Sequence, residues 1–435
     1  MVMRSINYPP GPTNSRETLV SFARSPLDTL INLYQTYGDF VHYQLGPSHV
    51  YLINRLSLIR QVLVEMNDVV ERTKLTHETL GKFIGPGLLV SAGDLHKRQR
   101  RTIQPAFTPA WIAGYAQLMV EATLEAIHHW RPGETRDVLD DMTTLSMQIV
   151  YRTIFGNNDS SADSAALDAI VTLQKYSGEA LIRKSSISED TVQQARDSLN
   201  RSVDALIMQR RQSRGKDFLS LLLDTRDTET GQPMSDEQAR VEAINFFVAG
   251  QETSATALVW TWWLLALNPD AESALHAEID SILGDALPTP EHLSQLHYTE
   301  NVIKESMRVM PPVWLIGRRT TVPITLDGYE IDPEASIAIS PYVLHRIPEY
   351  YPDPERFNPL RFEGELPRYS YLPFGTGPHV CIGQPFGMME VALILTTIAR
   401  RWRLKLVADQ QIVPEPLITL RPINGIKVTL EARNA

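Results

Sequence analysis

One apolar segment near the middle of the chain constrains the fold more than any other feature of the sequence. Ser235 begins a Ser-x-x-Gln pattern that ends at Gln238, which is a helix start signal. Asn268 and Pro269 form a stop signal, because a residue before proline avoids the helical region. The stretch between them predicts a helix of about 32 residues, or roughly 48 Å.

This segment is apolar on nearly every side, around FFVAG and ALVWTWWLLAL. A helix of that kind is buried all round. Polar residues interrupt it at its midpoint, in the run 251–254, so it is too polar to span a membrane. Because buried polar groups are costly unless they are hydrogen-bonded, the midpoint is a candidate functional position.

Strand patterns lie towards both ends of the chain, and the helical period dominates between about residues 56 and 310. Residues 39–55 indicate two strands around a Gly-Pro-Ser turn. Asp327-Gly328 between apolar runs is a hairpin signal, and residues 403–432 again favour strands. We therefore expect a mainly α protein with a smaller β portion. Since strands far apart in sequence must pair, we expect one domain over residues 1–435.

The composition is that of a globular protein, with 43% hydrophobic and 21% charged residues. A net charge of −10 argues against nucleic acid as a partner. The N-terminal region has no long apolar run, so we expect neither a signal peptide nor a membrane anchor, and a cytoplasmic location. Cys381 is the only cysteine, which excludes disulfides within the chain and fits a reducing compartment.

That cysteine lies in the glycine-rich loop FGTGPHVCIG, residues 374–383. Most free cysteines are small buried hydrophobic residues. Here, however, Pro385 suits the first turn of a helix, so Cys381 falls just before a helix N-terminus, where the helix dipole stabilises a thiolate. The glycines, Gly375, Gly377 and Gly383, would let a flat group approach the backbone. A thiolate beside a flat group indicates haem iron held by sulfur.

Two other interpretations of the loop are weaker. The loop is not a dinucleotide fingerprint, because the third glycine is missing and no strand–helix crossover follows. A nucleophilic pair of Cys381 with His379 is also possible, but residues two apart do not face each other on a helix.

The loop resembles the haem-binding signature of the cytochrome P450 monooxygenases. Its fixed positions are matched by Phe374, Gly377, His379, Cys381 and Gly383. Three further motifs occur in the family's order: AGQET (249–253), Glu-Ser-Met-Arg (305–308) and PERF (354–357). The resemblance implies the cytochrome P450 fold, an α-rich lobe and a smaller β-rich lobe that enclose haem b (iron protoporphyrin IX).

The resemblance also implies roles for the residues of these motifs. Cys381 would bind the iron, and Phe374 and Gly383 would contact the cofactor. Thr253 would act in oxygen activation and Glu252 in proton delivery. The remaining cofactor contacts would come from Ala249 and Gly250 beside the haem, and from His96, Arg100, Arg318 and His379 at its propionates. Arg318 is preferred to the adjacent Arg319 because of its ten-residue spacing to Gly328.

Two further groups follow from the resemblance. The first is a buried structural triad behind the haem, formed by Glu305, Arg308 and Arg356. The second is an apolar substrate pocket lined by Phe247, Val313, Trp314, Leu315, Leu417 and Ile418. With no charged anchor among these pocket residues, we expect a lipophilic substrate such as a fatty acid, terpenoid or carotenoid.

The function expected from the resemblance is insertion of one oxygen atom of O2 into that substrate. Electrons would come from a separate ferredoxin or flavodoxin with its NAD(P)H-dependent reductase. The basic segment 96–101 would attract this partner through Lys97 and Arg101. The alternatives are a peroxygenase that uses hydrogen peroxide, and a haem sensor or carrier without turnover. The retained Glu252-Thr253 pair disfavours both.

Overall fold

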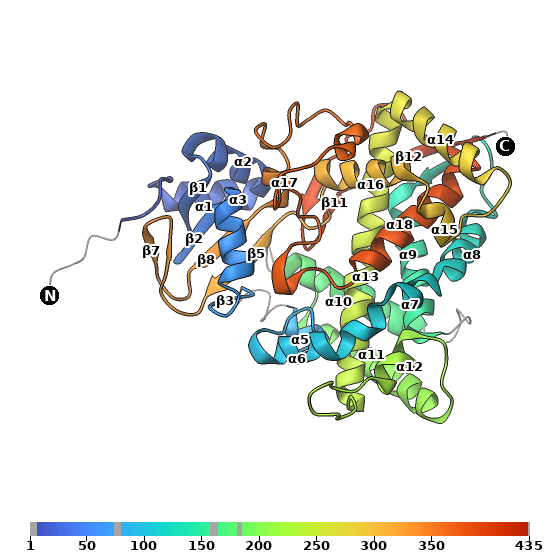
Figure 1. Cartoon of the computed structure of the whole chain (residues 1–435), viewed down its shortest axis with the longest axis horizontal. Coiled ribbons are helices and arrows are strands. Elements are labelled where there is room, and N and C mark those ends of the chain that lie inside the picture. Colours follow the sequence, from blue (N-terminus) through green and yellow to red (C-terminus); the bar gives the residue numbers. More distant parts are fainter. Residues whose placement is uncertain (1–6, 74–79, 157–163, 181–184, 434–435) are drawn as a thin grey trace. The chain divides into compact units, whose positions relative to one another are not determined.

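The computed structural model describes residues 7–73, 80–156, 164–180 and 185–433 (Figure 1). The chain forms two compact units. The first, here called the β-rich unit, contains residues 7–73, 308–356 and 364–381 of the described chain. The second, the helical unit, contains the rest. The chain enters each unit more than once, so neither unit is a continuous segment. The expected single domain over residues 1–435 stays a prediction.

The β-rich unit is built on a five-stranded sheet with the order β1-β2-β8-β5-β3. Its strands are β1 (Phe40–Leu45), β2 (Ser48–Ile53), β3 (Val70–Glu71), β5 (Ile316–Thr320) and β8 (Ser336–Ile339). The β1–β2 hairpin confirms the strand pair predicted within residues 39–55. Strand β2 pairs in parallel with β8, with Val50 opposite Ser336, so strands far apart in sequence do pair.

A second hairpin and several short helices complete this unit. The hairpin joins β6 (Ile324–Leu326) to β7 (Tyr329–Ile331), as Asp327-Gly328 predicts. Both turn residues have positive φ, 50° and 81°, which a tight hairpin turn of this kind requires. The helices are α1 (Ser15–Arg24), α2 (Pro26–Tyr37), α3 (Leu56–Arg60) and α17 (Pro341–Leu344), with a π-helical turn at Gln61–Glu65 and a 3₁₀ turn at Gly377–His379.

The helical unit holds most of the helices (Figure 1). They are α5 (Gly81–Ile84), α6 (Gly93–Ile103), α7 (Pro109–Ala113), α8 (Ala116–Ile127), α9 (Val138–Phe155), α10 (Ser164–Ala180), α11 (Glu189–Gln212), α12 (Phe218–Asp224), α13 (Asp236–Leu267), α14 (Pro269–Leu283), α15 (Pro290–Leu293), α18 (Gln384–Ala399) and α16 (His297–Val309), whose last two residues belong to the β-rich unit. Two 3₁₀ turns lie at Gln104–Phe107 and Pro359–Glu363.

Helix α13 is the predicted long helix, with 32 residues between Ser235 and Asn268. The Ser235 side chain accepts a hydrogen bond from the backbone N–H of Gln238, which confirms the predicted cap. Helices α9 and α18 pack beside α13 (Figure 1). Trp260 and Trp262 are both buried, in agreement with the burial expected on all sides. Among the described residues, none of the helices combines the length and the apolar character that crossing a membrane requires.

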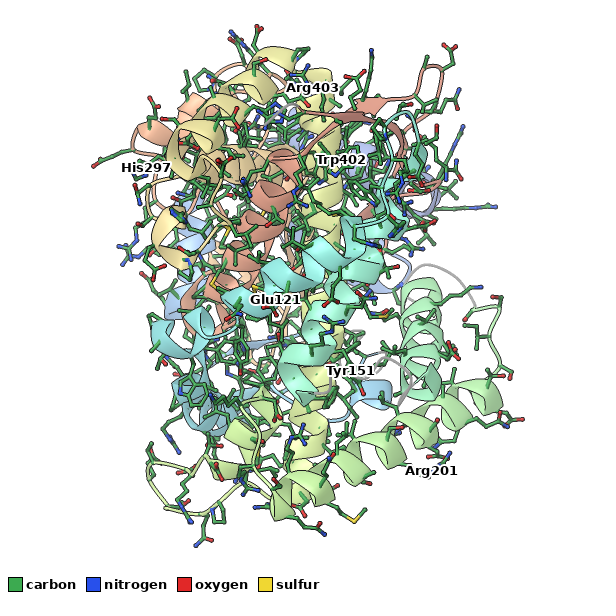
Figure 2. The ribbon with its side chains drawn as sticks, turned by 90° about the vertical axis from the view of Figure 1, so that its right-hand side faces the viewer. Glu121, Tyr151, Arg201, His297, Trp402 and Arg403 are labelled. Atoms are coloured by element: carbon green, nitrogen blue, oxygen red, sulfur yellow. The ribbon has the colours of Figure 1, made fainter. Side chains whose placement is uncertain are left out.

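Two small sheets complete the helical unit, and all of their strands except β4 lie near the C-terminus. One has the order β4 (Thr135–Asp137), β12 (Lys427–Ala432) and β9 (Trp402–Leu406), and the other pairs β10 (Pro414–Pro416) with β11 (Leu420–Pro422). Trp402 packs edge-on against Trp130, with ring centroids 5.9 Å apart. The neighbouring Arg403 forms an ion pair with Glu272 of α14; both Trp402 and Arg403 are marked in Figure 2. These contacts fix the C-terminal strands on the helical unit.

Candidate functional site

The cysteine loop has the placement that the sequence predicts. Cys381 lies two residues before Gly383, the N-cap of α18, and Pro385 stands in the first turn of that helix. The thiol side chain is exposed. The backbone N–H of Cys381 donates to the carbonyl of Phe374 at 2.9 Å and so closes the loop. The chain therefore holds this one sulfur at the end of a closed turn.

Gly377 is required here by the protein's own backbone. Its φ is +74°, and a Cβ at this position would lie 2.1 Å from the carbonyl oxygen of Leu63. The expectation that this glycine makes room for a flat group is therefore wrong, because the π-helical turn at Gln61–Glu65 fills the space. Gly375 also has positive φ, +69°, but nothing lies within 4 Å of a Cβ placed there.

Two arginines of the β-rich unit lie close enough to influence each other. Arg318 of β5 is buried, and its pKa falls to about 9 because of burial and the nearby positive charge of Arg72. Arg72 follows β3, and burial lowers its pKa to about 10, partly offset by the Cys381 thiolate. The buried Nε of Arg72 has no hydrogen-bond partner among the described residues. Arg319, by contrast, forms ion pairs with Glu71 and Glu334.

These two guanidinium groups fit the carboxylate edge of a haem. Two neighbouring buried cations destabilise each other unless an anion lies between them. The two propionates of haem would supply that charge and would accept the N–H groups that the protein leaves unsatisfied. The sequence predicted Arg318 but missed Arg72, because only the pairing of β3 with β5 brings these positions together.

The other expected propionate residues lie on different elements. His96 and Arg100 stand one turn apart on α6, with His96 buried and Arg100 partly buried. His379 ends the 3₁₀ turn at Gly377–His379 and is partly buried. The predicted helix that places His96 and Arg100 on one face is confirmed.

The midpoint of α13 shows the predicted back-bond. The Thr253 hydroxyl donates to the carbonyl of Ala249 at 2.8 Å. A Cβ at Gly250 would lie 3.4 Å from a methyl group of Val150 on α9. That distance is an ordinary van der Waals contact, so the packing of α9 against α13 does not require glycine at this position.

Two polar neighbours of Thr253 have partners from elsewhere in the helical unit. The Glu252 carboxylate accepts a hydrogen bond from the Thr419 hydroxyl at 2.6 Å. Gln251, which is buried, accepts one from the side chain of Gln174 on α10, also at 2.6 Å. These contacts satisfy the polar groups that the sequence left unexplained in an apolar helix.

A buried acid that the sequence did not predict lies on α18. Glu390 is completely buried and accepts a 2.5 Å hydrogen bond from Ser254, the residue after Thr253. Burial raises the pKa of Glu390 to about 8, so its carboxyl group is mostly protonated at neutral pH. It joins α18, which follows the cysteine loop, to the midpoint of α13. A sequence signal existed, because an acid stands within an apolar helix.

The expected structural triad differs in one member. Arg308 is completely buried and donates to the backbone carbonyls of His345, at 2.8 Å, and Arg356, at 3.3 Å. The side chain of Arg356 is exposed instead of buried. Its backbone carbonyl contacts Arg308.

The buried carboxylate of Glu305 contacts an arginine outside the expected triad. It accepts hydrogen bonds from the backbone N–H of Asn358 at 2.8 Å and from Arg361 at 3.3 Å. Arg361 lies in the 3₁₀ turn that follows the PERF motif, and its side chain is only 10% exposed. The PERF motif did not indicate this contact, because Arg361 lies outside the motif.

One expected pocket residue is wrongly assigned. Phe247 is completely buried and packs against Phe155 and Tyr151 of α9, with both ring-centroid distances 6.3 Å. Tyr151 is marked on α9 in Figure 2. Because α13 is apolar all round, its periodicity did not show which face meets α9, and Phe247 lies on that face. It is a core residue.

The remaining residues expected to line the substrate pocket lie on two separate segments of the chain. Trp314 is buried, and its backbone carbonyl accepts a hydrogen bond from Ser340 at 2.8 Å. The others are partly buried and are Val313, Leu315, Leu417 and Ile418.

Comparison with known proteins supports one family. Residues 9–430 match the family model for cytochrome P450. Cyclooctatin synthase of Streptomyces melanosporofaciens is 37% identical, over 92% of this chain and 90% of its own length. Cyclooctat-9-en-7-ol 5-monooxygenase of the same organism is also 37% identical, over 88% and 86%. Pentalenene oxygenase of Streptomyces avermitilis is 28% identical, over 94% of both chains. With a cysteine loop and a polar helix midpoint of this geometry, the chain belongs to the cytochrome P450 family of monooxygenases.

Proposed function

We propose that this cytochrome P450 monooxygenase oxygenates a cyclic terpenoid. The observation that carries the proposal is the 37% identity, over about nine tenths of the chain, to cyclooctatin synthase and cyclooctat-9-en-7-ol 5-monooxygenase. Pentalenene oxygenase points to the same substrate class. The partly buried apolar side chains of Val313, Leu315, Leu417 and Ile418 suit a substrate without charge. Of the three lipophilic classes expected from the sequence, the terpenoids are therefore favoured.

The cofactor in this proposal is haem b, which when bound supplies activation of O2 at its iron. Cys381 would be the iron ligand, supported by the closed loop and by the positive charge of Arg72. The proposed partners of the propionates are the cationic side chains of Arg72, Arg318, His379, His96 and Arg100. Phe374 and Gly383 of the loop, and Ala249 and Gly250 of α13, would contact the ring.

Thr253 and Glu252 are the proposed catalytic pair. The Thr253 hydroxyl donates a hydrogen bond to the backbone carbonyl of Ala249. By rotating its side chain, Thr253 could donate this hydrogen to oxygen instead. The Glu252 carboxylate is adjacent in sequence and can accept and return a proton. Thr253 would hold oxygen in place, and Glu252 would bring the protons that convert the second oxygen atom to water.

A separate ferredoxin or flavodoxin with its NAD(P)H-dependent reductase is the proposed electron source, in the cytoplasm. Lys97 and Arg98 of α6 are exposed and would attract an acidic partner. Arg101 is a poorer candidate than the sequence suggested, because it forms ion pairs with both Asp227 and Glu229 and is less exposed than Lys97, whose own ion pair with Asp94 is longer, at 3.7 Å. Charge reversal of Lys97 and Arg98 should slow reduction most strongly at low salt, compared with reversal of the exposed Arg201 on α11 (Figure 2).

The substrate class is tested by ligand binding followed by turnover. The purified haem protein is titrated with cyclic terpene hydrocarbons and alcohols, fatty acids and carotenoids, and the low-to-high-spin change of its spectrum is measured. Compounds that bind are then incubated with a surrogate ferredoxin, reductase, NADPH and ¹⁸O₂. We expect cyclic terpenoids to give the spin change and products with one ¹⁸O atom. A spin change with fatty acids alone, or turnover with hydrogen peroxide but not with the reductase, would contradict the proposal.

A further inference from the structure

The strongest unexplained contact in the helical unit joins Glu252 to the C-terminal segment. The donor, Thr419, is almost completely buried and lies immediately before β11. Its hydroxyl oxygen lies 2.6 Å from Oε1 of Glu252, which is a short and therefore strong hydrogen bond to a carboxylate. The two residues come from distant parts of the chain, so their contact depends on the fold.

The direction of this hydrogen bond follows from a second contact. Thr256, one turn after Glu252 on α13, donates to the Thr419 hydroxyl oxygen at 3.5 Å. A threonine hydroxyl has a single hydrogen, which in Thr419 is directed to Glu252. The order is therefore Thr256 to Thr419 to Glu252. The first contact is long for an O–H···O hydrogen bond, so the short bond from Thr419 to Glu252 is the main one.

The residue after Thr419 is hydrogen-bonded to α13, and the two residues before it are expected to line the substrate pocket. After it, the carbonyl of Leu420 accepts a 2.6 Å hydrogen bond from the buried indole of Trp260 on α13. Before it, Leu417 and Ile418 are partly buried, and the backbone N–H of Leu417 donates to the Thr419 carbonyl at 3.1 Å. The segment 417–419 is thus a turn fixed to α13, with two apolar side chains next to the hydroxyl.

Helix α10 contacts the same region from another direction. A Cβ placed on Gly178 would lie 3.7 Å from a methyl group of Leu417. One turn earlier on α10, Gln174 donates to Gln251 beside Glu252. The acid therefore lies where α10, α13 and the turn 417–419 meet, and among the described residues Thr419 is the hydrogen-bond donor to its carboxylate.

We propose that Thr419 is a positioning residue that holds the Glu252 carboxylate and links it to the substrate-facing turn 417–419. This inference rests on the proposed function, because Glu252 is taken as the proton-delivering acid. The tether restricts Glu252 to one arrangement beside Thr253, so that protons reach oxygen only along that route. Without the tether, the carboxylate is free to rotate, and reduced oxygen is lost as peroxide or water.

The test uses variants of the full-length haem protein. Thr419→Val removes the hydroxyl at nearly constant volume, Thr419→Ser keeps it, and Thr261→Val is the matched control. Thr261 is a buried threonine of α13 whose hydroxyl bonds only the carbonyl of Ala257, at 2.7 Å. For each variant the product formed per NADPH consumed is measured, together with kcat, KM and peroxide release.

We expect Thr419→Val to reduce product per NADPH about tenfold, the loss expected for one hydrogen bond to a charged group. KM should change little, because the apolar side chains of the turn remain. Thr419→Ser should restore the yield, and Thr261→Val should keep it. Coupling in Thr419→Val equal to that of the unmodified protein would overturn the proposal.

A second measurement does not need turnover. Thr419→Val should lower the melting temperature in the unmodified background, but much less in a Glu252→Ala background, where the acceptor is gone. If the protein oxygenates no terpenoid, the proposed function fails, and the melting cycle still decides whether the tether exists. Equal melting losses in both backgrounds would show that Thr419 does not hold Glu252.

Discussion

The buried acid of α18 gives a stability change whose sign and size can be worked out. Glu390 has no exposed surface, and burial raises the pKa of its carboxyl group from an ordinary value of 4.5 to about 8. The folded protein therefore keeps this proton over a pH range in which the unfolded chain has lost it. Stability falls wherever the folded state binds more protons, so Glu390 makes the protein less stable as pH rises from about 4.5 to about 8.

The size of the effect follows from the same two pKa values. Each tenfold difference in proton affinity corresponds to about 1.4 kcal/mol, so the whole range from 4.5 to about 8 corresponds to about 5 kcal/mol. Between pH 5.5 and pH 8.5, the unmodified protein should lose about 3 kcal/mol of unfolding free energy through Glu390. Glutamine at this position has the same shape and can still accept the Ser254 hydrogen bond, but it does not ionise.

The assay is urea unfolding of the haem protein, followed by circular dichroism at pH values from 5.5 to 8.5. Glu390→Gln should match the unmodified protein at the low end and exceed its stability by about 3 kcal/mol at the high end. Glu121→Gln is the control, because Glu121 is an exposed carboxylate of α8 (Figure 2). Parallel pH profiles for Glu390→Gln and the unmodified protein would refute the reasoning.

Three further outcomes can be measured directly. Cys381→His should keep some haem but lose monooxygenation, because imidazole donates less electron density to iron than thiolate; the spectrum of the reduced CO complex and product formation test this. Gly377→Ala should lower the haem content far more than Gly375→Ala. Both glycines have positive φ, but only at Gly377 would the added Cβ lie 2.1 Å from a backbone carbonyl oxygen; equal haem contents would contradict this. Arg361→Leu should destabilise the protein by about 2 kcal/mol, because it removes a charged hydrogen-bond donor from the buried Glu305 carboxylate, and Arg356→Leu, at an exposed side chain, should cost clearly less.

Local signals account for what the sequence predicted correctly. The caps of α13 and the hairpin turn at Asp327-Gly328 depend on neighbouring residues, so their positions could be given to within a residue or two. The cysteine loop was recognisable because its signature is continuous. The general class of fold followed from these elements.

The errors and omissions share a different cause. Arg72 meets Arg318, and Thr419 meets Glu252, through contacts between segments that lie far apart in the chain. No pattern in a short window contains such a pair. Phe247 was misplaced because a helix that is apolar on every side gives no periodic signal of which face meets its neighbour.

The contact of Gly377 with the Leu63 carbonyl has a consequence for the synthesis of the protein. Leu63 leaves the ribosome early, but the glycine that packs on its carbonyl is translated near the end of the chain. Domains generally fold from the N-terminus as they are made, yet this loop has no surface to pack on without both segments. The geometry that presents the sulfur can therefore form only after translation is nearly complete, so the proposed capture of haem through Cys381 would be a late event in the maturation of this protein.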